Sequence, residues 1–160
     1  MSYQVELSLQ NRVLSGGVNR MLRVPLLLDE LLVSGRWPRD EKEANAQNIK
    51  ALASQERVMA LAPEEQWLIL LPPPFYTIRQ KSVGNRFWTW DMAAPHGIDF
   101  DLALDIGDFG LGSDAPILLD YRENKATPRV IRLRWSPDGK TNEWVIMAPD
   151  FASFVASLGL

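Results

Sequence analysis

Cysteine is absent from the 160 residues of the chain, and histidine occurs only once, as His96. The absence of cysteine excludes disulfide bonds, thiolate metal ligands and cysteine nucleophiles, because each of these requires a thiol. It is also compatible with a reducing compartment. We therefore expect a cytoplasmic protein.

Long apolar runs are also absent. The runs Leu26–Leu28 and Leu68–Leu71 are far shorter than the roughly 20 residues that a helix needs to cross a bilayer. Residues 1–9 contain neither a basic region nor a continuous apolar core, so we expect no signal peptide. The sequence thus predicts no membrane association.

The composition that is present suits one globular domain. Hydrophobic residues make up 46% of the chain and charged residues 23%. A chain of this length buries roughly 68–70% of its unfolded surface, which allows a sizeable core. The net charge of −3 disfavours nucleic acid as a partner. We expect most of the six tryptophans to lie in the core.

The first 70 residues are predicted to be rich in helix after an N-terminal strand. Apolar and polar side chains alternate from Tyr3 to Gln10, which is typical of a half-buried strand. Pro25 and Gly35 bracket a short helix at Leu26–Val33, because proline favours the first turn of a helix and glycine its end.

Residues 40–61 are also predicted to be mainly helical, with Ser54 capping a second short helix. The apolar face of this region would contain Ala44, Ile49, Leu52 and Ala53. The run Pro72–Pro74 can continue neither a helix nor a strand ladder. It therefore predicts a stiff connector between the helix-rich part and a C-terminal sheet.

Residues 75–160 predict that sheet and a closing helix. Strand signals fall at Phe75–Gln80, Phe87–Trp90, Ile117–Tyr121, Val130–Trp135 and Glu143–Met147. The turn Ser136–Gly139 makes the last two strands an antiparallel hairpin, with Arg132 and Arg134 on a solvated face.

After the predicted N-cap Asp150, apolar residues at helical spacing predict the last helix. They are Phe151, Phe154, Val155 and Leu158. Helices at both ends with strands between them indicate an α+β fold with a mixed or mainly antiparallel sheet. We predict a single domain over residues 1–160, with residues 1–70 helix-rich and residues 75–160 forming the sheet and closing helix.

Negative charge is concentrated between Arg86 and Arg122, an interval without lysine or arginine. It contains seven aspartates, at positions 91, 99, 101, 105, 108, 114 and 120. We interpret residues 105–121 as a glycine-rich acidic loop followed by a buried strand. Exposed carboxylates on one side of the molecule would attract a basic protein. The predicted partner-binding residues are Asp99, Asp101, Asp105 and Asp108, and simple solubility is the alternative use of their charge.

Two catalytic or cofactor motifs can be considered in the same interval. Residues 110–115 match the letters of a dinucleotide fingerprint, but Pro116 and a strand-like run follow where the chemistry needs a helix. Ser113, Asp114 and His96 could form a triad, but the nucleophile elbow that would expose the serine is missing. We therefore predict no catalytic residues and no cofactor.

Metal and phosphate sites are also disfavoured. The spacing of the aspartates at 99, 101, 105 and 108 is not that of a calcium loop, and no glutamate completes it. Helix caps and turns are the simpler use of these aspartates. The arginines at 122, 129, 132 and 134 could contact phosphate, but a solvated strand face with cross-strand pairing to Glu143 is the preferred interpretation.

Three segments of the C-terminal half carry a family resemblance. Gly107–Arg122, Pro128–Trp135 and Ala148–Leu160 resemble, in content and in order, the SUKH superfamily, which includes yeast cell-wall-assembly regulators and many bacterial proteins. The similarity covers about 55 residues and depends on moderately specific motifs. The N-terminal half departs from the family pattern, because its proline run Pro72–Pro74 comes late.

The resemblance implies an α+β fold and a protein that acts by binding. Bacterial members are similar to immunity proteins that neutralise secreted toxins by direct contact. The positions that match the family motif are Gly110, Gly112, Asp114 and Asp120, and the resemblance implies a structural role for them. Our leading hypothesis is an immunity-type protein with a basic toxin domain as partner. A regulatory or scaffold module, or a small-ligand or metal-binding protein, is the alternative.

Overall fold

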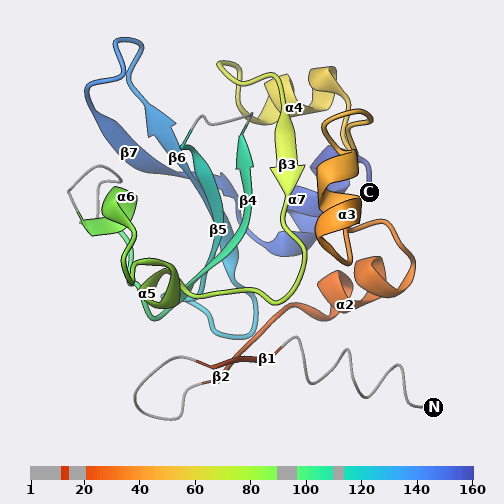
Figure 1. Ribbon diagram of the computed structural model, residues 1–160, viewed down its shortest axis with the longest axis horizontal. Coiled ribbons are helices and arrows are strands. Elements are labelled where there is room, and N and C mark those ends of the chain that lie inside the picture. Colours follow the sequence, from red (N-terminus) through yellow and green to blue (C-terminus); the bar gives the residue numbers. More distant parts are fainter. Residues whose placement is uncertain (1–11, 15–20, 90–96, 110–113) are drawn as a thin grey trace.

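The computed structural model describes residues 12–14, 21–89, 97–109 and 114–160, and its core is a five-stranded antiparallel sheet with helices around it (Figure 1). The strands are β3 (Leu68–Leu70), β4 (Ala103–Phe109), β5 (Pro116–Asp120), β6 (Arg129–Trp135) and β7 (Asn142–Ala148). Their order in the sheet is their order in the chain. A separate hairpin joins β1 (Arg12–Leu14) and β2 (Met21–Arg23). The predicted α+β class is confirmed.

Six helices are present in the described ranges. They are α2 (Leu26–Val33), α3 (Glu41–Ala46), α4 (Gln55–Leu61), α5 (Ile78–Lys81), α6 (Arg86–Thr89) and α7 (Phe151–Leu158). The predicted caps are confirmed, because Ser54 accepts a hydrogen bond from the Arg57 amide and Asp150 accepts one from the Ser153 amide. None of these helices has the length and apolar character that crossing a bilayer would require.

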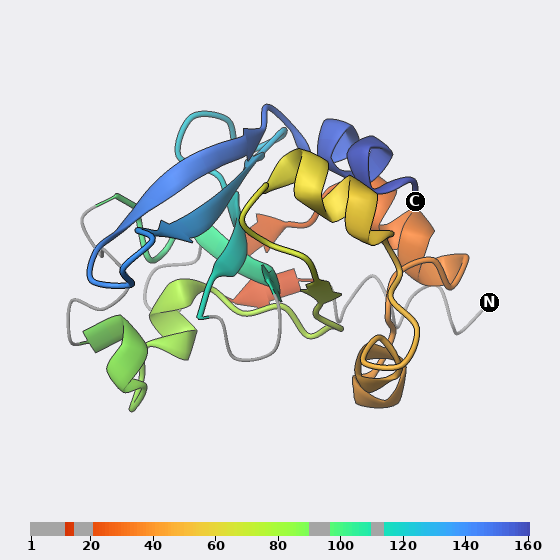
Figure 2. The ribbon, with the colours of Figure 1, turned by 90° about the horizontal axis from the view of Figure 1, so that it is seen from above.

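Apolar side chains cover both faces of the sheet. On one face, α2, α4 and α7 pack against Leu104, Ile106 and Leu119 in the larger core. On the other face, α5 and α6 pack through Ile78 and Trp88 against the middle strands. Figure 2 shows these two short helices on the side of the sheet away from α4 and α7. Because the larger core joins residues before and after the proline run, both parts of the chain share it.

Two predicted strands are wrong. The region Phe75–Gln80 instead begins α5, because Thr77 and Gln80 form a capping box in which each side chain binds the other residue's backbone amide. The predicted strand Phe87–Trp90 overlaps α6. In both places a local helix start outweighs the strand preference of aromatic and β-branched residues.

The helical region 40–61 divides into α3 and α4. Gln47 ends α3, and its side chain leaves the helix to bind the backbone of β3. Residues 47–54 are therefore not helical, and Ile49, predicted on the apolar face, is 94% exposed. The N-terminal strand predicted at 3–10 lies outside the described residues.

The stretch beginning at Asp105 is not the acidic loop that we predicted. Residues 103–109 form β4, a central and largely buried strand. A β-bulge between Asp105 and Gly107 disturbs the alternation of side chains, and burial on both faces removes the polar positions that a sequence pattern needs. The buried strand predicted at Ile117–Tyr121 corresponds to β5.

Candidate binding groove

The four aspartates predicted to bind a partner do not form one open acidic surface. Arg79 binds both carboxylate oxygens of Asp101 at 3.1 Å, and this contact lowers the pKa of that carboxyl. Asp99 accepts a hydrogen bond from the Asp101 amide, and Asp108 accepts one from the Ala115 amide. Asp105 is only 6% exposed, so the prediction that it supplies surface charge is wrong.

Among the four residues for which the resemblance implies a structural role, Asp120 has a well-defined environment. It is 1% exposed at the end of β5, where Arg122 binds both of its oxygens at 2.9 Å and Arg129 binds Oδ2 at 2.8 Å. Burial opposes ionisation, but the two guanidinium groups outweigh it and lower the pKa of Asp120. Asp114 has a positive φ of 48°, and its carbonyl accepts a hydrogen bond from the Trp135 indole. Gly110 and Gly112 lie outside the described residues.

The other arginines of the predicted basic row are also paired. Arg134 pairs with Glu143 across the hairpin, as predicted. Arg132 was predicted on a solvated face, but it is 3% exposed, lies over the Phe109 ring and pairs with Glu64. Partial burial of Glu64 acts to raise the pKa of its carboxyl, but the contact with Arg132 outweighs burial and lowers that pKa. Ser113 and His96, considered for a triad, lie outside the described residues.

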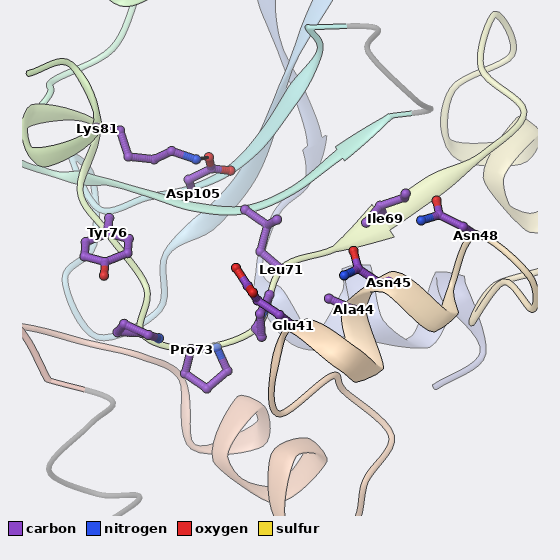
Figure 3. Close-up of a pocket in the computed structure, with 12 residues that line it drawn as sticks. Glu41, Ala44, Asn45, Asn48, Ile69, Leu71, Pro73, Tyr76, Lys81 and Asp105 are labelled. Carbon is purple, nitrogen blue, oxygen red and sulfur yellow. Dashed lines mark hydrogen bonds and ion pairs between the residues drawn. The ribbon is translucent and has the colours of Figure 1, made fainter. Parts of the chain in front are cut away.

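A groove of about 630 Å³ runs between α3, the proline segment and β4 (Figure 3). Glu41, Ala44 and Asn45 face it from α3, and Leu71 with the three prolines forms an apolar wall. Lys81 and Asp105 close the opposite side and point toward each other, and Tyr76 also lines the groove, with its ring directed away from this pair. Segments from three separate parts of the sequence, residues 41–48, 69–81 and Asp105, therefore meet at one site.

Hydrogen bonds fix the walls of this groove. The side-chain amide of Gln47 donates to the Leu70 carbonyl at 2.8 Å and accepts from the Leu70 amide at 2.9 Å. The Trp37 indole donates to the Leu71 carbonyl at 2.8 Å. The Asp105 amide donates to the Tyr76 carbonyl at 3.1 Å, which holds Tyr76 against β4. These contacts hold α3, β3 and the Tyr76 segment in place before any partner arrives.

Gly107 allows the close approach of β3 to β4 beside the groove. A Cβ atom at this position would lie 2.8 Å from the Ile69 carbonyl oxygen, which is shorter than real contacts allow. The glycine is therefore required by the spacing of the two strands.

Asp105 and Lys81 form the charged end of the groove. The Lys81 ammonium pairs with Asp105 Oδ2, whereas Oδ1 is buried and has no hydrogen-bond partner. Burial raises the pKa of Asp105, and Lys81 and the Gly107 amide act in the opposite direction. A buried carboxylate oxygen without a hydrogen-bond partner is uncommon in folded proteins.

The groove combines one ion pair, two asparagines and an apolar wall. In the described part of the chain, no three His, Cys, Asp or Glu side chains gather as a metal site would require. The sequence marks Asp105 as a charge among Ala, Leu and Ile, a signal of burial that we interpreted instead as exposure.

No protein-family model, curated protein or solved structure matches the chain. A functional assignment therefore depends on the groove and on the residues that form it.

Proposed function

We propose that this chain is a protein-binding domain that docks its partner at the groove between α3, the proline segment and β4. The observation that carries the proposal is a groove that joins a rigid apolar wall to a buried carboxylate with one unpartnered oxygen. Tyr76, which is 48% exposed at this groove, is of a residue type enriched at interface hot spots. The hydrogen-bonded walls reduce the entropy that docking must cost.

The resemblance of residues 107–122 to the SUKH superfamily supports a more specific proposal. A protein of the immunity type would neutralise a toxin domain in the cytoplasm by covering its functional surface, without catalysing a reaction. A basic toxin fits the net charge of −3. In this proposal Asp105 recognises the partner from within the groove, and Asp99, Asp101 and Asp108 contribute only the surrounding negative field.

Two alternatives remain as proposals. A regulatory or scaffold module would use the same groove for a partner that is not a toxin, and a neighbouring gene for a toxin domain would distinguish the two. A small-ligand protein is favoured by one observation, the volume of about 630 Å³, which is typical of small-molecule pockets.

The proposal can be tested by filling the groove. Asn45 and Ala46 are adjacent, exposed residues of α3, but only Asn45 lines the groove. We expect a protein captured from native lysate by the wild type to be captured by Ala46→Trp and lost with Asn45→Trp, as measured by mass spectrometry. Equal capture by all three, or capture by none, would overturn the proposal.

A further inference from the structure

Two buried aspartates on neighbouring strands differ in how their oxygens are used. Both oxygens of Asp120 accept hydrogen bonds from guanidinium groups. Asp105 has an ammonium partner at Oδ2 and none at Oδ1. A buried acceptor without a donor destabilises the protein. A donor from a binding partner would remove this cost, which would favour binding. Because Asp105 is one of the residues that line the groove, a donor that enters the groove would arrive next to this carboxylate.

The charge of the groove selects a cationic donor. Its charged lining residues are Glu41, Asp105 and Lys81, which together carry one excess negative charge. An anion such as phosphate would meet two carboxylates. A divalent metal ion would find too few oxygen ligands, since hard cations require about six. An organic cation with several N–H groups therefore fits best.

The residues that line the groove favour the guanidinium group of arginine over the ammonium group of lysine. A guanidinium is planar, offers five N–H donors and stacks on aromatic faces, whereas an ammonium is a compact and strongly hydrated charge. Tyr76 contributes an aromatic ring to the lining of the groove, and the apolar wall of Leu71 and the prolines can cover a methylene chain (Figure 3). Both features favour arginine.

We infer that the groove receives an arginine side chain from the partner protein, whose guanidinium donates to Oδ1 of Asp105 and whose methylene groups pack along Leu71 and the prolines. The inference rests on the proposed function and names the group that the groove recognises. Because Oδ1 is covered by neighbouring atoms, a side chain must shift on binding. Lys81 is partly exposed and unbranched, and it can move while keeping its contact with Oδ2.

The probe is N-acetyl-arginine amide, with the uncharged isostere N-acetyl-citrulline amide as control. In an amide-detected NMR titration we expect saturable shifts of the Tyr76, Lys81 and Gly107 amides, with a dissociation constant on the order of 1 mM for so small a ligand. Citrulline should bind at least about tenfold more weakly, because it lacks the charge. Equal binding of the two compounds would overturn the inference.

Variants place the binding at Asp105. Asp105→Asn should weaken binding of the arginine probe about 10- to 100-fold, since one charge-assisted hydrogen bond is lost. Glu56→Gln removes the same charge in α4, outside the groove, and should change it less than about twofold. Asn45→Trp should abolish binding by occlusion, which provides a second variant if Asp105→Asn fails to fold. An unchanged affinity in either groove variant would contradict the inference.

The captured partner separates this inference from the proposed function. If Asn45→Trp abolishes capture and a folded Asp105→Asn retains it in full, the groove binds a protein but not through an arginine. If the arginine probe binds as expected and no protein is captured, the cation site is supported and the protein-binding function is overturned. Loss of capture in both variants supports both.

Discussion

Asp105 and Asp120 lie on adjacent strands and are almost equally buried, but they differ in their charged partners and in the direction of their pKa shifts. Asp120 is held by two arginines, and its pKa is lowered despite burial. Asp105 has one lysine, and burial raises its pKa. The two aspartates therefore differ in how completely their carboxylates are paired, and we propose that the less completely paired one, Asp105, serves binding and the other the fold.

The largest expected effect is the loss of Asp120. Asp120→Asn would remove the negative charge and one of the two acceptor oxygens that Arg122 and Arg129 share, and we expect the free energy of unfolding to fall by about 2–3 kcal/mol. Both arginines keep some access to water, which keeps the loss below that of a fully buried pair. Urea unfolding measures the change. Asp138→Asn, in an exposed turn, is the control. If both variants lose equally little free energy of unfolding, Asp120 does not contribute to the stability of the fold as we expect.

The effect of pH should have opposite signs at the two sites. Asp120 has a lowered pKa in the folded state, so its contribution is full above the unfolded-state pKa of about 4 and is lost as pH falls through the folded value. Asp105 has a raised pKa, so the wild type gains stability relative to Asp105→Asn as pH falls through that value toward about 4. Urea titrations of both asparagine variants across pH measure this. If the stability difference between the wild type and each variant changed with pH in the same direction at both sites, the opposite pKa shifts of Asp105 and Asp120 would be contradicted.

A smaller effect is expected from Asp105→Asn on stability. The substitution removes an incompletely partnered buried charge, and the partly exposed Lys81 can turn toward water. We therefore expect the free energy of unfolding at neutral pH to stay the same or rise, by no more than about 1 kcal/mol. Thermal and urea unfolding provide the measurement. A loss of more than about 1 kcal/mol would mean that Asp105 is structural like Asp120.

The smallest effect is expected when Asp105 is given a partner like those of Asp120. Lys81→Arg would place a guanidinium where it can donate to both oxygens, and we expect a gain of about 0.5 kcal/mol. The same change should weaken binding of N-acetyl-arginine amide, because Oδ1 is then occupied. Lys81→Gln is the comparison, since it keeps a donor without the charge. Stronger binding of N-acetyl-arginine amide to Lys81→Arg than to the wild type would refute the claim that Oδ1 of Asp105 binds the probe.

The parts of the fold that could be predicted from sequence are those with local causes. The closing helix α7 follows from the Asp150 cap, its apolar stripe and Gly159, which takes the left-handed conformation with φ 76°. The β6–β7 hairpin follows from its turn, where the Gly139 amide binds the Ser136 carbonyl. Each signal lies within a few residues of the structure that it produces.

The candidate site could not be predicted, because its causes are distant in sequence. The burial of Asp105 depends on Lys81, Tyr76 and β3, and the buried Arg132 depends on Glu64. Strand β4 is covered on both faces, so it lacks the alternation that identifies a strand. Charge at Asp105 was visible in the sequence, but its partners were not.

The bond between Gln47 and Leu70 has a consequence for the behaviour of the protein in crowded solution. An edge strand with free amide and carbonyl groups is a template on which another chain can add a strand and start aggregation. At β3 the donor and acceptor of Leu70 are already taken by one glutamine side chain, which imitates a neighbouring strand. Growth of the sheet from this edge would first have to displace the Gln47 side chain from Leu70.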